Sequence, residues 1–176
     1  DPGTNFMGYA ILKTTGKNCK PELVVSGVVD MKKMTDPYLK LQRVFQRTLQ
    51  VIDSYHPDEL AIESQFYGKN IQSMLKLGRA QGVAIAAALQ RNIPIFEYAT
   101  KKIKMSITGT GEASKEQIAL LLGKFMTIPT TISTLDETDA IAIAYCHHLQ
   151  GNLPTTGNPK CKDWGDFIKQ NPDKVL

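Results

Sequence analysis

The sequence has little of three features that would place it in a specialised class of protein. Its 176 residues include three cysteines, Cys19, Cys146 and Cys161, with no Cys-x-x-Cys pair. Neither a disulfide framework nor a zinc site is indicated, so we expect reduced thiols. No apolar run is long enough to cross a bilayer, and no secretory leader pattern is visible at the start. We therefore expect a cytoplasmic protein with no membrane partner.

The excess of one charge is also small. Net charge is +4 at pH 7, which permits a polyanionic partner without demanding one. The length suits one domain of ordinary size with a real core. We expect this domain over residues 1–150, followed by a C-terminal tail over 151–176 that is rich in proline and has few apolar anchors.

Apolar patterning predicts strands that alternate with helices. Short segments rich in Val, Ile and Leu indicate strands at 7–14, 21–31, 58–63 and 93–99. Apolar residues three and four apart predict helices at 38–55, 71–89, 101–107, 115–126 and 136–150. Ser114 and Gln117 have the spacing of a capping box. This order predicts an α/β domain with a mixed central sheet and helices over its faces.

Four acidic residues lie at the ends of these predicted elements: Asp1, Glu63, Asp136 and Asp139. "LAIE" ends at Glu63, and "DAIAIA" begins at Asp139, so their flanks are apolar. An ionised carboxylate beside a buried strand is costly unless Lys, Arg or a metal ion compensates its charge. Asp136 and Asp139 are three residues apart and share one face of a helix.

Each acid taken alone has a plain structural interpretation. Asp136 is typical of a helix N-cap, Glu63 could pair with a lysine, and Asp1 could be a turn residue. Their joint arrangement favours another hypothesis, because clustered carboxylates suit Mg²⁺ or Mn²⁺. Such a cluster points to phosphoryl chemistry, in which two ions about 4 Å apart stabilise the attacking and leaving oxygens.

Four segments carry a family resemblance: "DPGT" with "GYAI", "PDELAIESQFYGKNIQSMLKLGRAQGVAIAAAL", "IPIFEYATKKIKMSITGTGEASKEQI" and "LDETDAIAIAYCH". In these segments the sequence resembles the RuvC family of Holliday-junction resolvases. The resemblance implies a ribonuclease-H-like fold, with a central mixed five-stranded sheet flanked by helices. It also implies that Asp1, Glu63, Asp136 and Asp139 form the catalytic, metal-binding set.

The activity that the resemblance implies is Mg²⁺-dependent hydrolysis of a phosphodiester, which leaves a 5′-phosphate and a 3′-hydroxyl. Mn²⁺ is an expected substitute, and two ions are expected per site. The family makes paired, symmetric nicks in four-way DNA junctions during recombination and repair. Its members are homodimers, here through the helix Ile71–Leu89, and they work beside branch-migration motor proteins.

Four further residues are expected to bind DNA. Phe66 follows Glu63 by three residues, and the family pattern favours a side chain that stacks on bases over a core aromatic. Lys104 and Lys115 lie in segments that are near DNA in the family, so phosphate contact is favoured over a solvated face. Lys69 is a weaker candidate of the same kind.

The same residues permit other interpretations. An actin-like or sugar-kinase ATPase also uses an Asp-x-Gly-Thr turn, but it needs a second domain and a second glycine-rich turn. Two alternatives stay open: a junction-binding module without catalysis, and a ribonuclease-H-like nuclease for another branched or hybrid substrate. In the family, apolar residues of a first strand precede the aspartate, so we expect such residues before Asp1 in the working protein.

Overall fold

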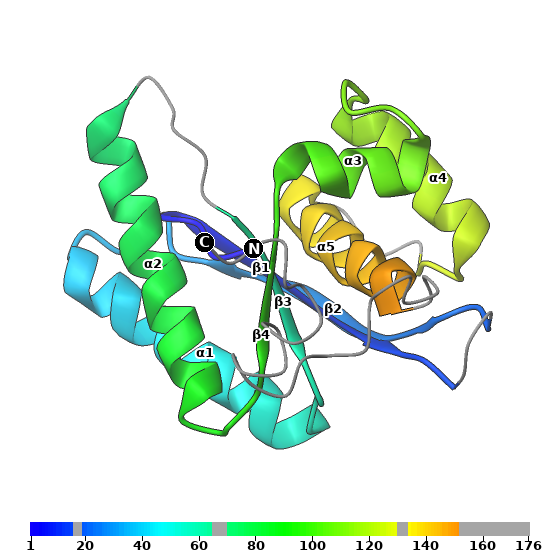
Figure 1. The fold of residues 1–176 in the computed structure, drawn as a ribbon. Coiled ribbons are helices and arrows are strands. Elements are labelled where there is room, and N and C mark those ends of the chain that lie inside the picture. Colours follow the sequence, from blue (N-terminus) through cyan, green and yellow to red (C-terminus); the bar gives the residue numbers. More distant parts are fainter. Residues whose placement is uncertain (16–18, 65–69, 130–133, 152–176) are drawn as a thin grey trace, which may run out of the picture.

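The computed structural model describes residues 1–15, 19–64, 70–129 and 134–151. Its strands are β1 (Phe6–Lys13), β2 (Glu22–Asp30), β3 (Leu60–Glu63) and β4 (Ile95–Tyr98). Its helices are α1 (Pro37–Tyr55), α2 (Ile71–Leu89), α3 (Thr100–Thr108), α4 (Lys115–Phe125) and α5 (Leu135–Gly151) (Figure 1). The predicted order of elements is confirmed. Of the predicted tail over 151–176, Gly151 is the last residue of α5, and 152–176 lie outside the described residues.

The strands form two hydrogen-bonded pairs. β1 and β2 are antiparallel, with a register shift between Ile11 and Leu12, and β3 and β4 are parallel. The described residues thus hold four strands in two pairs, where a five-stranded sheet was expected. A cavity of about 810 Å³ is lined by residues of both β1 and β3, together with residues of α1 and α5.

Helices cover both sides of the strands (Figure 1). The period of two along β1 explains this, since successive side chains point to opposite faces. Met7 packs with Val44 of α1 and Ala84 of α2. Ala10 packs on the opposite side, against the core that α3, α4 and α5 share. The result is three layers with the strands in the middle.

Gly8 is the point at which β1 meets the start of α5. A Cβ added to Gly8 would lie 2.1 Å from the main-chain oxygen of Asp136. Only glycine therefore permits this approach. Gly8 also exchanges two main-chain hydrogen bonds with Asp1, each of 3.0 Å between nitrogen and oxygen. The pairing places Asp1 beside the first turn of α5.

The first turns of α4 and α5 carry two of the predicted site residues, Lys115 and Asp136. The capping box of Ser114 and Gln117 is confirmed, and it makes Lys115 the first residue of α4. α5 begins at Leu135, so Asp136 lies inside its first turn. The interpretation of Asp136 as an N-cap is therefore wrong, although the helix dipole still favours an acid there. Within the described ranges, no helix is long and apolar enough to span a membrane.

Candidate active site

Three of the four predicted carboxylates come together at the edge between β1 and α5. One carboxylate oxygen each of Asp1, Asp136 and Asp139 lies within 4.8 Å of the others. All three residues are partly buried. Asp136 and Asp139 are brought together by their helical spacing, and the contact at Gly8 brings Asp1 to them.

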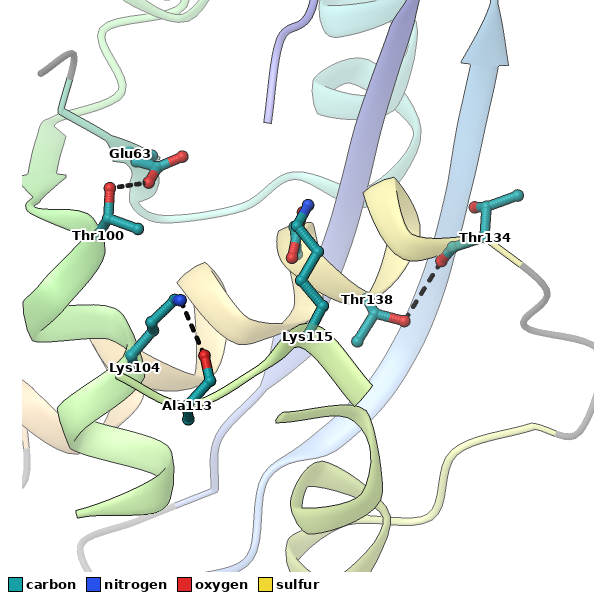
Figure 2. A network of polar contacts seen from close by, with 8 residues as sticks. Glu63, Thr100, Lys104, Ala113, Lys115, Thr134 and Thr138 are labelled. Atoms are coloured by element: carbon teal, nitrogen blue, oxygen red, sulfur yellow. Dashed lines mark hydrogen bonds and ion pairs between the residues drawn. The ribbon is translucent and has the colours of Figure 1, made fainter. Parts of the chain in front are cut away.

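Glu63, the fourth predicted carboxylate, does not belong to this group of three. It ends β3, where it pairs in register with Tyr98 of β4. Thr100 donates a hydrogen bond to its Oε1, as Figure 2 shows. The buried Gln81 of α2 donates from Nε2 to the main-chain oxygen of Glu63 at 2.9 Å. Glu63 is therefore fixed by groups from two helices.

Lys115 supplies positive charge to the cluster. Its ammonium group forms an ion pair and hydrogen bond with Asp139. Partial desolvation lowers the pKa of Lys115, but the hydrogen bond to Asp139 and the negative charges nearby outweigh it, so the pKa is raised. Those charges include Asp136 and Glu63. Lys115 thus stays protonated at neutral pH and faces all of these acids.

The composition of the site fits a hard divalent cation. Asp1, Asp136, Asp139 and Glu63 offer oxygen donors only, the type that Mg²⁺ and Mn²⁺ prefer. Lys115 is the one cation that an ion pair joins to these acids among the described residues. Negative charge therefore remains in excess, which a metal ion would offset.

Lys104, which is expected to contact DNA phosphate, hydrogen-bonds to the backbone between α3 and α4. Its Nζ donates to the main-chain oxygen of Ala113 at 2.8 Å (Figure 2). This bond ties α3 to the segment that leads into Lys115. An ammonium group has three donors, so the contact does not preclude a phosphate partner. Phe66 and Lys69, the other two predicted DNA-binding residues, lie outside the part of the chain that the structure describes.

Sequence reasoning missed several residues that hold the site. Thr100 and Gln81 fix Glu63. Ser26 of β2 donates from Oγ to Oε1 of Glu137 at 2.6 Å, which ties the first turn of α5 to the sheet. One signal was present for Thr100, because it follows the strand that pairs in parallel with β3. Residues just past neighbouring parallel strands lie at one edge of a sheet.

Comparison with known proteins then decides the family. The family described as "Crossover junction endodeoxyribonuclease RuvC" matches residues 1–147. This chain belongs to the RuvC family. The RuvC protein of Cytophaga hutchinsonii is 51% identical over 176 residues, covering 99% of this chain and 85% of that protein. The RuvC protein of Bacteroides fragilis is 51% identical over 177 residues, covering 99% and 93%.

Solved RuvC structures share the fold. Thermus thermophilus RuvC in complex with a Holliday junction substrate superposes with a TM-score of 0.79 at 26% identity, covering 86% of this chain and 92% of that one. A second Thermus thermophilus RuvC structure gives a TM-score of 0.77 with the same coverage. These matches confirm the α/β, ribonuclease-H-like fold class and the RuvC resemblance.

Proposed function

We propose that this RuvC chain is a structure-specific endonuclease that resolves four-way DNA junctions by paired, symmetric nicks in recombination and repair. The observation that carries the proposal is the convergence of Asp1, Asp136 and Asp139 within 4.8 Å of one another. Membership of a family of crossover junction endodeoxyribonucleases supports the substrate. It also favours this function over that of a ribonuclease-H-like nuclease for another substrate.

The four carboxylates act as metal ligands and Lys115 as their counter-charge. Mg²⁺, or Mn²⁺ in its place, would supply Lewis-acid activation of the attacking water and of the scissile phosphate. Asp1, Asp136 and Asp139, together with Glu63 at the end of β3, would hold two such ions. Water attacks phosphorus and the bond to the 3′ oxygen breaks, which leaves a 5′-phosphate and a 3′-hydroxyl. Lys115 offsets negative charge on the phosphate.

Contacts with the DNA backbone would come from the same side of the site. Lys104 lies in α3 and Lys115 lies in α4, and Figure 2 shows both in one view with Glu63. Phosphate contacts of this kind position DNA without reading its sequence. Phe66 and Lys69 follow Glu63 closely in the sequence. We assign base stacking to Phe66 and a phosphate contact to Lys69.

A homodimer through α2 would supply two such sites for paired nicks. α2 packs on α1 and the strands through Ala80, Ala84 and Ala87, which are buried. A second face remains exposed, with Ile71, Leu75 and Leu89 as its large apolar residues. Cβ atoms added at Gly78 and Gly82 would meet nothing within 4 Å. This face supports close approach of a second copy. Branch-migration motor proteins stay predicted partners.

Glu63→Gln tests the metal-ligand role directly. The variant removes a charged ligand and retains the shape of the side chain, so we expect junction cleavage to be lost and junction binding to be retained. Glu22→Gln is the matched control, because Glu22 is exposed at the start of β2. Cleavage by Glu63→Gln at the rate of this control would contradict the assignment. Tight binding without cleavage by the unaltered chain would instead indicate a non-catalytic binding module.

A further inference from the structure

The end of β3 and the start of α3 are held side by side by the parallel pair of strands. Glu63 lies opposite Tyr98 in the register, and the Ser64 nitrogen donates to the Tyr98 oxygen at 2.9 Å. Only Ala99 separates Tyr98 from Thr100, the first residue of α3. The pairing of β3 with β4 therefore places the Thr100 side chain beside the carboxylate of Glu63, although the two residues are far apart in the sequence.

The hydroxyl of Thr100 is directed at Glu63 and not at the helix that it begins. Ala99 is the N-cap of α3 and makes no side-chain capping bond. The hydrogen bond of Thr100 runs from Oγ1 to Oε1 of Glu63. Figure 2 shows the second oxygen of Glu63 pointing away from Thr100. One carboxylate oxygen is thus engaged, and the other is presented on the opposite side.

The backbone of Glu63 is fixed as well. Gln81 is 6% exposed, and its Nε2 donates to the Glu63 main-chain oxygen at 2.9 Å. The peptide position and the orientation of the carboxylate are therefore set by different helices, α2 and α3. A glutamate has three rotatable side-chain bonds, so a fixed backbone alone would leave its carboxylate free to turn.

We propose that Thr100 is a positioning residue that orients Glu63 as a single-oxygen metal ligand. The inference rests on the proposed function, because it assigns Glu63 to the metal set. Partners that hydrogen-bond to a ligating carboxylate fix its orientation and strengthen metal binding, typically by about 10- to 100-fold. Thr100 touches neither the proposed ion nor the DNA in this account. It acts through Glu63 alone.

Direct binding of Mn²⁺ to the full chain, without DNA, tests the proposal. Thr100→Val keeps the β-branched shape and removes the hydroxyl, and we expect it to weaken Mn²⁺ binding by about 10-fold. Thr100→Ser retains the hydroxyl and is expected to bind within about twofold of the unaltered chain. Thr108→Val is the matched control on α3, because the hydroxyl of Thr108 bonds to the Lys104 main-chain oxygen, away from Glu63. Electron paramagnetic resonance of free Mn²⁺ gives the affinities.

Glu63→Gln in the same titration distinguishes failure of the Thr100 positioning role from failure of the Glu63 metal-ligand role. If Glu63→Gln weakens Mn²⁺ binding while Thr100→Val binds like the unaltered chain, the positioning role is wrong and the metal assignment stands. If Glu63→Gln also leaves binding unchanged, the proposed function loses its fourth ligand, and the role of Thr100 fails with it. The Mg²⁺ concentration for half-maximal junction cleavage should rise in Thr100→Val by the same factor as the Mn²⁺ dissociation constant.

Discussion

Lys115 at the start of α4 donates a hydrogen bond to the carboxylate of Asp139 on α5, across 24 residues of sequence. This contact joins a residue proposed to bind DNA phosphate to a residue proposed to bind metal. The capping box at Ser114 and the bond from Lys104 to Ala113 fix the backbone on which Lys115 is carried. Lys115 therefore offsets part of the negative charge of the carboxylates, and it is also the residue proposed to contact DNA phosphate.

Replacing Lys115 should separate metal binding from catalysis. Lys115→Gln removes a cation that competes for Asp139, so Mn²⁺ binding should become tighter. The side chain is 49% exposed, and exposed ion pairs are worth roughly 0.2–1 kcal/mol, so we expect a gain of about 1.5- to 5-fold. Junction cleavage should fall by about 100-fold or more, because charge stabilisation is lost.

Lys101→Gln is the control for that experiment, because Lys101 is 82% exposed and lies 3.8 Å from Glu112, outside the cluster. It should leave Mn²⁺ binding unchanged. Weaker Mn²⁺ binding in Lys115→Gln would mean that Lys115 organises the carboxylates rather than competing for one of them.

The approach of β1 to α5 can be tested at Gly8. Gly8→Ala places a Cβ against the Asp136 main-chain oxygen, and such overpacking costs about 1–3 kcal/mol. The two elements must move apart, so Mn²⁺ binding should weaken as well. Gly123→Ala in α4 meets nothing within 4 Å and should add about 0.5–1 kcal/mol of stability. Urea unfolding measures the stability of both variants, and equal stability would contradict the close contact of Gly8 with α5.

If the exposed face of α2 is the dimer interface, a charged substitution on that face should prevent dimerisation. Leu75 is 54% exposed on the face that carries Gly78 and Gly82. Leu75→Glu places a charge there and should give monomers in sedimentation equilibrium, because a buried unpaired carboxylate is costly. Leu120→Glu on α4, where Leu120 is 68% exposed, should leave the dimer intact. Dissociation of both variants, or of neither, would remove α2 as the interface.

The buried thiol of Cys146 gives a prediction on pH. Desolvation raises the pKa of Cys146, and the Ser106 hydrogen bond and the Lys102 charge offset this only partly. A raised pKa leaves less thiolate at pH 8, and the thiolate is the reactive form. A chain that retains only Cys146 should react with a thiol reagent at least about tenfold more slowly than one that retains only the exposed Cys19. Equal rates in the folded protein would contradict the packing of α5 against α3.

The order of strands and helices was predictable because apolar spacing records which faces are buried. The convergence of Asp136 and Asp139 followed from helical spacing alone. The division of the strands into the pairs β1–β2 and β3–β4 did not follow from spacing, because spacing along one strand contains no information about its neighbour. The five-stranded sheet was expected from the family resemblance, and the described residues hold two pairs of strands.

Contacts between segments that are distant in the sequence were also not predicted. The Nδ1 atom of His147 lies 2.7 Å from the Tyr98 hydroxyl, and its Nε2 lies 2.7 Å from Oε2 of Glu59, contacts that no sequence pattern indicated. Thr100 and Glu63 likewise meet only because β3 and β4 pair. Such pairs depend on tertiary packing, which local sequence propensity does not report.

The activity proposed for this chain is metal-dependent cleavage of a four-way DNA junction. The most direct measurement is incubation of the chain with a labelled four-way DNA junction and with a linear duplex of the same sequence, each with Mg²⁺ and with a chelator. We expect symmetric nicks, with 5′-phosphate ends, in the junction with Mg²⁺ only. Nicks of equal yield in the linear duplex, or nicks that persist with the chelator, would contradict it.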